Sequence, residues 1–358
     1  MTLSVVLIHY HTPDLLERSV QALLDDGQKS HLDLLVVDNG SHPEDRALFD
    51  RLPIRLLSPK ANLGYAGGIN LGMAETTSDH VVVMNPDVLV RPGCLRALQD
   101  ALEDGAAVAG PRFFWDEQHQ LLLPPTEPMG RWWEISNVLA ERGGFLARRA
   151  RRRWRRHAQR HWLAEETIPS HDLSGALLAL QRKAWTQIGP FDEGYPLYFE
   201  ETDWLVRLRR NGLGAVYVPR AKAVHLYAQS SVKEGRAAEW FQISCRRFRR
   251  KVYGPAFTRF LEGLGRWVER SPKAPTSPAT ARSKAQVRWL EIAPSAKGYP
   301  AAGWRLAEDL TMDPGGWPIP DTVWQRMAPG TYWLRGVAAT GQELGEECRE
   351  KRDDGGQE

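Results

Sequence analysis

The sequence predicts an α/β protein with an open sheet, and two observations carry that prediction. Short apolar runs rich in β-branched residues alternate, along the amino-terminal part, with segments whose apolar residues recur at helical spacing. The run Val81–Met84 ends in Asn85-Pro86-Asp87, which cannot continue a central strand because proline lacks a backbone N–H. Ligands of open α/β sheets bind at the carboxyl ends of strands, so Asp87 lies where a metal ion or phosphate would be met. A second interpretation is a turn in which Asp87 merely caps the next element of the chain.

The composition indicates a folded protein. The chain has 358 residues, of which 42% are hydrophobic and 25% charged, enough for one large domain and a smaller one. The net charge is only +3, but one segment concentrates eight arginines, namely Arg148, Arg149, Arg151, Arg152, Arg153, Arg155, Arg156 and Arg160. This basic segment predicts an anionic partner or surface.

Cysteine usage and hydropathy bear on the compartment. The three cysteines, Cys94, Cys245 and Cys348, form no CxxC pair, which fits a reducing compartment and gives no thiolate metal site. The first residues lack the pattern of a signal peptide, and no stretch approaches the roughly eighteen apolar residues that a spanning helix needs. We therefore expect a cytoplasmic protein whose membrane contact, if any, is peripheral.

The first elements follow a strand, helix, strand order. Thr12-Pro13-Asp14 has the pattern of a helix start, and Gly27 ends that helix. Several glycines precede an expected helix through Ala74, and glycine lets a backbone approach a ligand closely. The expected strands are Leu3–Ile8, Leu32–Val37, Ile54–Leu57 and Val81–Met84.

The pattern loosens between residues 113 and 169 and then resumes. That stretch combines tryptophans with the arginine cluster, so we interpret it as an elaboration outside the core sheet. A helix opens at Tyr198–Asp203, with its acids in the first turn where the helix dipole favours them. Further expected elements are the strands Leu173–Leu180 and Gly214–Val218, followed by His225, and a basic helix from Ala237 to Val252.

The carboxyl-terminal part changes composition. We expect a linker at 263–284, because its centre is rich in proline, serine, threonine and alanine. Two alternating segments predict a small β module at 285–342, sandwich-like and short for independent stability. Residues 343–358 are expected to form a charged, disordered tail.

Five motifs in order resemble the family 2 glycosyltransferases, in particular their rhamnosyltransferase-like branch. They are Val5–Tyr10, Val36–Ser41, Asn62–Asn70, Met84–Val88, and Gly189–Glu193 leading to Tyr198–Asp203. The resemblance covers residues 1 to 255, most weakly across 113–169. It implies a GT-A type, Rossmann-like mixed sheet flanked by helices as a catalytic domain over 1–262, with 113–169 on the acceptor or membrane side. It also implies a nucleotide-sugar donor, a divalent cation and inversion at the anomeric carbon.

The resemblance implies roles for individual residues. Asp87 matches the metal-binding position and His225 the second ligand position, for Mg²⁺ or Mn²⁺, with the imidazole favouring Mn²⁺. Glu201 matches the general base, where the family usually has Asp, so the neighbouring acids Glu200 and Asp203 are alternatives. Two positions would bind the nucleobase of the donor: Tyr10 would flank its ring, and Asp38 would accept from its imide N–H. The other donor-binding positions are Asn62, Gly64, Gly67, Asn70 and Asn85.

Each role has a plainer alternative. The acids of the Glu200 segment also suit a helix dipole, the glycines suit helix–strand packing, and His225 suits an ordinary hydrogen-bonded histidine. The arginine cluster suits a solvated helix face. Its interleaved tryptophans favour an interfacial helix over a nucleic-acid-binding arm, because amphipathic rings sit well at the headgroup boundary.

We therefore expect an inverting, metal-dependent glycosyltransferase that moves a hexose, such as L-rhamnose, from a dTDP- or UDP-sugar. The expected acceptor is a surface glycan or a lipid-linked glycan. We expect the protein to bind the inner face of the plasma membrane peripherally through Arg148–Arg160, and we expect no nucleic-acid partner. Two other classes stay open. One is a non-catalytic nucleotide-sugar or carbohydrate-binding protein of the same fold, and the other is a nucleic-acid-binding protein that uses the arginines.

Overall fold

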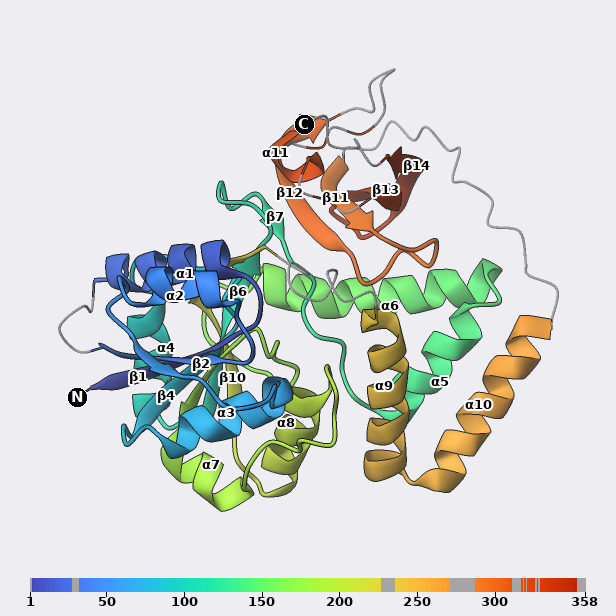
Figure 1. The fold of residues 1–358 in the computed structure, drawn as a ribbon. Coiled ribbons are helices and arrows are strands. Elements are labelled where there is room, and N and C mark those ends of the chain that lie inside the picture. The colour runs from blue at the N-terminus through green and yellow to red at the C-terminus, as the bar shows by residue number, and fades with distance from the viewer. Residues whose placement is uncertain are drawn as a thin grey trace. The chain divides into compact units, whose positions relative to one another are not determined.

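The computed structural model describes residues 2–27, 32–226, 236–270, 287–310, 317, 319, 321–325, 327 and 329–352. The chain divides into two compact units (Figure 1). The first unit comprises Met1–Phe113 and Ala164–Thr258, and the second comprises Phe114–Leu163 and Arg259–Glu358. The predicted division differs, since it grouped residues 113–169 with the amino-terminal domain.

A mixed sheet forms the centre of the first unit (Figure 1). Its strands lie in the order β6-β9-β4-β1-β2-β3, and β10 pairs with β5, β6 and β8. The neighbours from β4 to β3 are parallel, whereas β9 is antiparallel to both β4 and β6. The bounds are β1 (Leu3–His9), β2 (Leu32–Asp38), β3 (Arg55–Leu57), β4 (His80–Met84), β5 (Val88–Val90), β6 (Val108–Phe114), β8 (Ile168–Pro169), β9 (Leu177–Gln181) and β10 (Ala215–His225).

This topology confirms the predicted α/β class with a mixed sheet flanked by helices. The strands expected from Leu3, Leu32 and Val81 form almost as predicted. Two bounds differ: β9 begins at Leu177 rather than Leu173, and β10 continues past Val218 to His225. The longer β10 brings His225 beside the end of β4.

Helices cover both faces of this sheet because its central strands are apolar on both. All seven residues of β1 are buried. Val5 and Leu7 pack with α1 and α4, whereas Val6 and Ile8 pack with α3, α7 and α8. The helices are α1 (Pro13–Asp25), η2 (Pro43–Asp45), α2 (Arg46–Phe49), α3 (Gly64–Ala74), α4 (Cys94–Glu103), α7 (Arg182–Ile188), α8 (Glu200–Arg210) and α9 (Ala237–Tyr253).

The glycine-rich segment lies inside α3, whereas the sequence suggested that it precedes the helix. A Cβ at Gly72 would lie 2.2 Å from Val6 Cγ1, and one at Gly68 would lie 2.9 Å from Ile8 Cγ2. These glycines therefore let α3 approach β1 closely, which is the packing role. Gly64 begins the helix with a φ of +69°.

An antiparallel sheet and the long helix α6 dominate the second unit (Figure 1). Its strands lie in the order β14-β13-β11-β12-β7. The bounds are β7 (Leu121–Leu122), α5 (Arg131–Ala140), α6 (Gly144–Trp162), α10 (Pro255–Arg270, which begins in the first unit), β11 (Val287–Ala293), β12 (Ala302–Leu310), α11 (Asp321–Trp324), β13 (Gly330–Ala338) and β14 (Glu343–Lys351).

One face of α6 packs on this antiparallel sheet. Trp154 and Trp162 are buried with Trp289 of β11 and Val337 of β13. Trp162 stacks on Trp289, with ring centroids 5.3 Å apart. The predicted interfacial helix with tryptophans at the headgroup level is therefore wrong for these two rings, because they build the core of the second unit.

Two of the clustered arginines are buried with these rings. Arg155 donates to both carboxylate oxygens of Glu291, at 2.5 and 2.8 Å, and to Glu343 at 3.1 Å. Arg151 donates to both oxygens of Glu343, at 2.9 and 3.0 Å. These pairs match the charges of α6 to β11 and β14, since a buried guanidinium needs carboxylate partners. The two arginines therefore belong to the fold and not to a basic surface.

The predicted tail and linker also differ from the structure. Glu343–Lys351 forms β14, which pairs antiparallel with β13, so these residues are not a disordered tail. Residues 263–270 continue α10, and the rest of the predicted linker lies almost wholly outside the described residues. No helix among the described residues is long and apolar enough to cross a membrane.

Candidate active site

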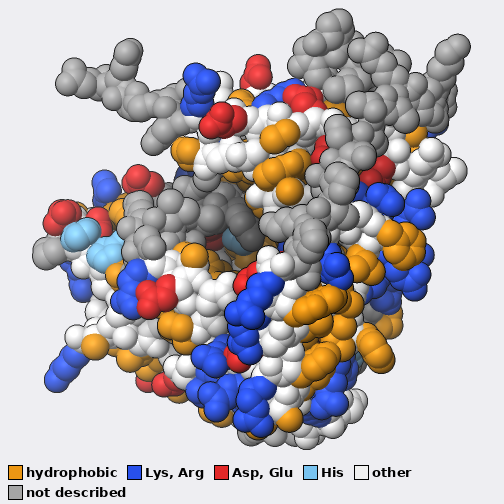
Figure 2. All heavy atoms as spheres, turned by 90° about the vertical axis from the view of Figure 1, so that its right-hand side faces the viewer, with side chains coloured by type: hydrophobic (Ala, Val, Ile, Leu, Met, Phe, Trp, Pro, Cys, Tyr) orange, Lys and Arg blue, Asp and Glu red, His pale blue; other side chains and the backbone are white. Residues whose placement is uncertain are grey.

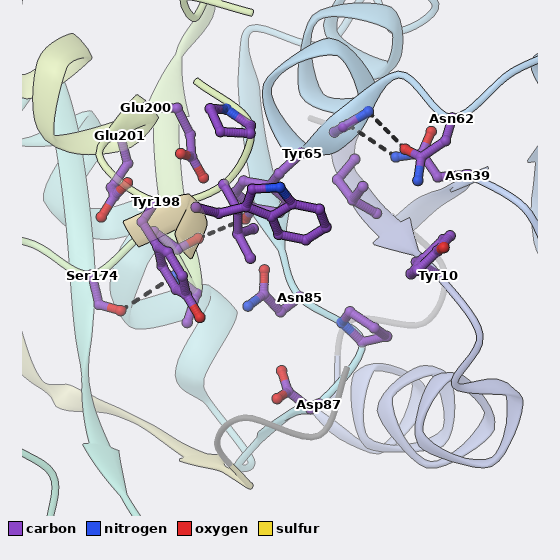
Figure 3. Close-up of a pocket in the computed structure, with 18 of the residues that line it drawn as sticks. Tyr10, Asn39, Asn62, Tyr65, Asn85, Asp87, Ser174, Tyr198, Glu200 and Glu201 are labelled. Atoms are coloured by element: carbon purple, nitrogen blue, oxygen red, sulfur yellow. Dashed lines mark hydrogen bonds between the residues drawn. The ribbon is translucent and has the colours of Figure 1, made fainter. Parts of the chain in front are cut away.

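A cavity of about 360 Å³ opens at the carboxyl ends of β1 and β4 in the first unit (Figure 3). Its lining residues come from segments far apart in the sequence. They are Ile8, Tyr10, Asn39, Asn62, Gly64, Tyr65, Asn85, Pro86, Asp87, Ser174, Gly175, Ala176, Pro196, Leu197, Tyr198, Glu200, Glu201, His225 and Trp240. The cavity thus brings together both predicted metal ligands, two of the three acids named for the base, and part of the predicted donor site.

Asp87 and His225 meet at the floor of this cavity. The turn after β4 carries Asp87, and antiparallel pairing of β5 with β10 sets His225 opposite Val88. The Leu226 N–H donates to the Asp87 backbone carbonyl at 3.0 Å, which holds the two segments together. As a result, His225 Nε2 lies 3.4 Å from Asp87 Oδ1.

This pair fits a divalent cation. Asp87 is 5% exposed, yet its buried Oδ1 accepts no hydrogen bond. A buried carboxylate oxygen without a partner is costly in an ordinary fold, and one cation between Asp87 and His225 would satisfy it. Within the described part of the chain, no three or more His, Cys, Asp or Glu residues cluster as metal ligands. The remaining coordination positions would therefore fall to water or to a bound ligand.

Glu200 and Glu201 begin α8 at another wall of the cavity. The two residues before them, Tyr198 and Phe199, have φ angles of +67° and +70°, a left-handed conformation that is strained for bulky side chains. The aromatic ring of Phe199 packs between Phe241 and Phe248 of α9, with centroid distances of 5.4 and 5.3 Å. This packing holds the strained turn and so fixes where α8 begins.

Burial controls the protonation of the two carboxyl groups. Burial, followed by the charge of Glu201, raises the pKa of Glu200 well above its ordinary value. Burial also raises the pKa of Glu201, whereas hydrogen bonds from backbone N–H groups and from Thr202 oppose the rise. Two neighbouring carboxylates disfavour double ionisation, so Glu200 and Glu201 titrate as a pair in which the hydrogen bonds to Glu201 favour its ionised form.

Asp203, the third predicted alternative for the base, does not line the cavity. It is 1% exposed and accepts hydrogen bonds from Arg207 at 3.1 Å and Lys251 at 2.9 Å. The Tyr195 hydroxyl donates to its other oxygen at 3.5 Å. These partners join α8 to α9, so Asp203 is a structural acid.

The opposite side of the cavity carries Tyr10, Asn39 and Asn62 (Figure 3). The Asn39 side chain donates to the Gly64 carbonyl at 2.9 Å and accepts from the Leu63 N–H at 3.3 Å. Asn62 Oδ1 accepts from the Gly64 N–H at 2.8 Å. These bonds fix the start of α3 against the end of β2 and shape a polar wall. In Figure 3, Asn85 lies between this wall and the two glutamates, and Asp87 lies below Asn85.

Asp38 lies next to that wall but is not among the lining residues. Its Oδ1 accepts from the Gly40 and Ser41 N–H groups at 3.2 and 3.0 Å and from the Ser41 hydroxyl at 2.5 Å. Burial alone would raise its pKa, but hydrogen bonds from His9, Ser41 and Gly40 outweigh burial and lower the pKa to about 2. Asp38 is therefore ionised, and Oδ2 takes part in none of these bonds.

Two residues predicted to bind the sugar donor do not line the cavity. Asn70 donates to the Phe191 carbonyl at 3.0 Å and accepts from the Phe191 N–H at 2.9 Å. A Cβ at Gly67 would meet Leu63 and, at 3.7 Å, Glu193. Both residues tie α3 to the Phe191–Glu193 segment and do not line the cavity, in contrast to Gly64.

Sequence reasoning missed several lining residues. Tyr65 donates its hydroxyl proton to the Gly175 carbonyl at 2.7 Å, and burial followed by the charges of Glu200, Glu201 and Asp87 raises its pKa well above the ordinary value. Trp240 enters from α9, and Ser174 precedes β9. Tyr65, Tyr198, Asn39 and Pro86 had a local signal, because each lies inside a motif that the sequence analysis singled out. Trp240 and Ser174 reach the cavity through tertiary packing alone.

Comparison with known proteins places these features in context. A family model described as glycosyl transferase family 2 matches residues 4–182. The chain is 31% identical over 251 residues to an N-acetylglucosaminyl-diphospho-decaprenol L-rhamnosyltransferase of Mycobacterium tuberculosis, covering 65% of this chain and 78% of that one. It is 22% identical over 228 residues to the low-salt glycan biosynthesis hexosyltransferase Agl10 of Haloferax volcanii, covering 62% and 66%. Among solved structures, the mannosyltransferase PcManGT of Pyrobaculum calidifontis aligns with a TM-score of 0.47 at 15% identity, covering 75% and 70%.

Proposed function

Because the chain belongs to glycosyl transferase family 2, we propose that this glycosyltransferase moves a hexosyl group from a nucleotide-sugar donor with inversion at the anomeric carbon. The observation that carries the proposal is the content of one cavity. A proposed pair of cation ligands, the buried Glu200 beside the partly buried Glu201, and a polar wall next to an aromatic ring all line it. The cation ligands suit the departure of a diphosphate, and the carboxyl groups suit the removal of a hydroxyl proton.

The donor would lie along the wall formed by the ends of β1 and β2. Tyr10 would flank the nucleobase of the donor, and Oδ2 of the ionised Asp38 would accept from an imide N–H of uracil or thymine. Asn62 and Gly64 would follow toward the sugar, and Asn85 adjoins the metal ligands. Because a carboxylate only accepts hydrogen bonds, Asp38 favours a nucleobase with an imide N–H, and therefore a dTDP- or UDP-sugar over other donors.

Asp87 and His225 would hold Mg²⁺ or Mn²⁺. When bound, the cation neutralises the charge that develops on the leaving diphosphate. The imidazole ligand favours Mn²⁺ over Mg²⁺, because Mg²⁺ strongly prefers oxygen. The support for this assignment is that Asp87 Oδ1 is buried and accepts no hydrogen bond.

Glu201 would act as the general base. It removes the proton of the acceptor hydroxyl while that oxygen forms a bond to the anomeric carbon, and the bond from that carbon to the diphosphate oxygen breaks on the opposite face. Glu201 is supported because it lines the cavity and because hydrogen bonds from backbone N–H groups and from Thr202 favour its ionised form. A protonated Glu200 could still donate a hydrogen bond inside the cavity.

For the sugar and the acceptor, we propose L-rhamnose from dTDP-rhamnose and a lipid-linked or surface glycan. The support is the mycobacterial relative, whose name describes an L-rhamnosyltransferase acting on N-acetylglucosaminyl-diphospho-decaprenol. A lipid-linked acceptor would place the reaction at a membrane surface.

A panel of nucleotide sugars tests the proposal. The purified chain would be incubated with Mn²⁺ and each of dTDP-rhamnose, dTDP-glucose, UDP-glucose, UDP-galactose and GDP-mannose, and released nucleotide would be measured. We expect slow donor hydrolysis with dTDP- or UDP-sugars, abolished by EDTA and restored by Mn²⁺. Tight binding of a donor with no turnover, with or without a glycosyl acceptor lipid, would instead indicate a non-catalytic binding protein.

A further inference from the structure

The outward face of α6 carries a stripe of arginines. Arg149, Arg152 and Arg156 follow Phe145 at intervals of three or four residues, so they share one side of the helix. All four side chains are exposed, whereas Ala147, Ala150, Trp154 and Ala158 face the core. From Phe145 to Arg156 the stripe extends about 16 Å along the helix.

Large aromatic side chains are exposed on the helices of the same unit. Trp132 of α5 is 82% exposed, Phe145 of α6 is 66% exposed, and Phe260 and Trp267 of α10 are 52% and 49% exposed. Burial of such side chains is favourable, so leaving four of them in water forgoes a sizeable stabilisation. Scattered single exposures are ordinary, but these four belong to three helices of one unit.

Contacts within the second unit link these helices. The Arg142 guanidinium, which follows α5, lies 4.5 Å from the ring centroid of Trp267 in α10. Exposed arginines accompany the rings on α10 as well, namely Arg259, Arg266 and Arg270. Figure 2, which views the side where α10 and α5 lie in Figure 1, shows hydrophobic side chains gathered beside lysine and arginine side chains. Glu269 is an exposed acid of α10.

We propose that this aromatic and basic surface of α5, α6 and α10 docks the chain on an anionic lipid bilayer. Arginines beside an anionic headgroup layer gain electrostatic attraction, and tryptophan and phenylalanine rings insert at the boundary between headgroups and acyl chains. The rings and guanidinium groups project from helix surfaces, and none of these helices lines the cavity of the first unit. A nucleic acid would instead be held by stacking rings along a groove.

This surface differs from the predicted one. The basic segment of the sequence was expected to bind lipid through its own tryptophans, yet Trp154 and Trp162 are buried and Arg151 and Arg155 are held by acids of β11 and β14. The rings available to a bilayer come from Trp132, Phe145 and α10. The docking proposal stands apart from the chemistry of the cavity, because binding to vesicles requires no donor.

Cosedimentation with vesicles tests the proposal on the full chain. Wild type would be compared on phosphatidylcholine vesicles and on vesicles with 30% phosphatidylglycerol, at several salt concentrations. The charge variant is Arg149→Glu/Arg152→Glu/Arg156→Glu, and the matched control reverses three exposed cations of the first unit, Lys183→Glu/Arg220→Glu/Lys222→Glu. We expect salt-sensitive binding to the anionic vesicles only. The charge variant should lose at least about a hundredfold in partition coefficient, since each basic residue contributes roughly fivefold, and the control should lose far less.

A second variant isolates the rings. Trp132→Ala/Phe145→Ala keeps every charge, and both positions are exposed, so its melting temperature should match that of wild type. We expect at least about a tenfold loss in partitioning onto anionic vesicles. Wild-type binding by this variant, equal losses in the charge variant and its control, or binding to single-stranded RNA but not to vesicles would each overturn the proposal.

Discussion

Single acids of the first unit differ in whether the fold supplies their hydrogen bonds. Asp203 and Asp38 are surrounded by donors, so their charges are satisfied by the fold itself. Asp87 Oδ1 and Glu200 Oε2 are buried and have no hydrogen-bond partner. A fold does not benefit from such atoms, because an unsatisfied buried oxygen costs about 1 to 3 kcal/mol. Both atoms lie at one cavity, where the proposed cation would satisfy Asp87 Oδ1.

The metal assignment predicts the behaviour of Asp87→Ala. Loss of a cation ligand should lower donor turnover by at least about a hundredfold, because the leaving diphosphate is no longer neutralised. The fold should persist, since Asp87 Oδ1 makes no hydrogen bond. Mn²⁺ should raise the melting temperature of wild type by mass action and leave that of the variant unchanged. Equal Mn²⁺ stabilisation of both proteins would remove Asp87 from the metal site.

The raised pKa of Glu200 predicts a pH-dependent stability. The folded chain binds this proton more tightly than the unfolded chain, whose value is near 4.5, so Glu200 destabilises the fold increasingly as the pH rises above that value. Glu200→Gln removes the effect. The variant should melt at the wild-type temperature near pH 4 and above it at pH 8, in thermal unfolding followed by circular dichroism. A variant that melts lower than wild type at pH 8 would contradict the raised pKa.

At the scale of elements, close packing fixes the active-site walls. α3 reaches β1 only because glycines face the strand, and that approach sets Asn62 and Gly64 at the cavity. The turn at Tyr198 and Phe199 sets the start of α8 in the same way, through aromatic packing on α9. Both elements are positioned by contacts outside the cavity.

A pair of glycine substitutions tests this packing. Gly72→Ala should destabilise by about 1 to 3 kcal/mol, because its Cβ would lie 2.2 Å from Val6 Cγ1 in a fully buried strand. Gly265→Ala in α10 is the control, since a Cβ there meets nothing within 4 Å. It should stabilise by roughly 0.5 to 1 kcal/mol through helix propensity. Denaturant unfolding measures both, and equal effects of the two substitutions would exclude close approach of α3 as the reason for Gly72.

Elements with a strong local pattern could be predicted, and elements that depend on a partner could not. The alternating apolar runs predicted the sheet because its central strands are buried on both faces. β14 escaped prediction because it has few apolar residues, and its Glu343 is matched by arginines of α6. The tryptophans interleaved with the arginines of α6 favoured an interfacial helix, but the sheet of the second unit covers Trp154 and Trp162. Among the site residues, motifs located Asp87, His225 and the glutamates, whereas Trp240 required the tertiary fold.

At the scale of the molecule, each unit is assembled from two separate stretches of chain. The first unit carries the whole cavity, which is why the motifs, although spread from Tyr10 to His225, converge on it. The second unit takes the arginine-rich stretch and the carboxyl-terminal strands, and buried ion pairs between α6, β11 and β14 join them. The chemistry and the proposed lipid contact therefore belong to different units.

The central claim is that Glu201 is the base of a glycosyl transfer reaction in this cavity, and Glu201→Gln tests it most directly. Turnover of the best donor in the panel and the affinity for its nucleotide would be measured together in Glu201→Gln, in Glu200→Gln and in Asp203→Asn, of which only the last changes an acid outside the cavity. A base acts in the transition state, so Glu201→Gln should lower turnover by at least about a hundredfold with nearly unchanged nucleotide affinity. Wild-type turnover in Glu201→Gln, with a collapse in Glu200→Gln or Asp203→Asn, would contradict the claim and give the role to that neighbour.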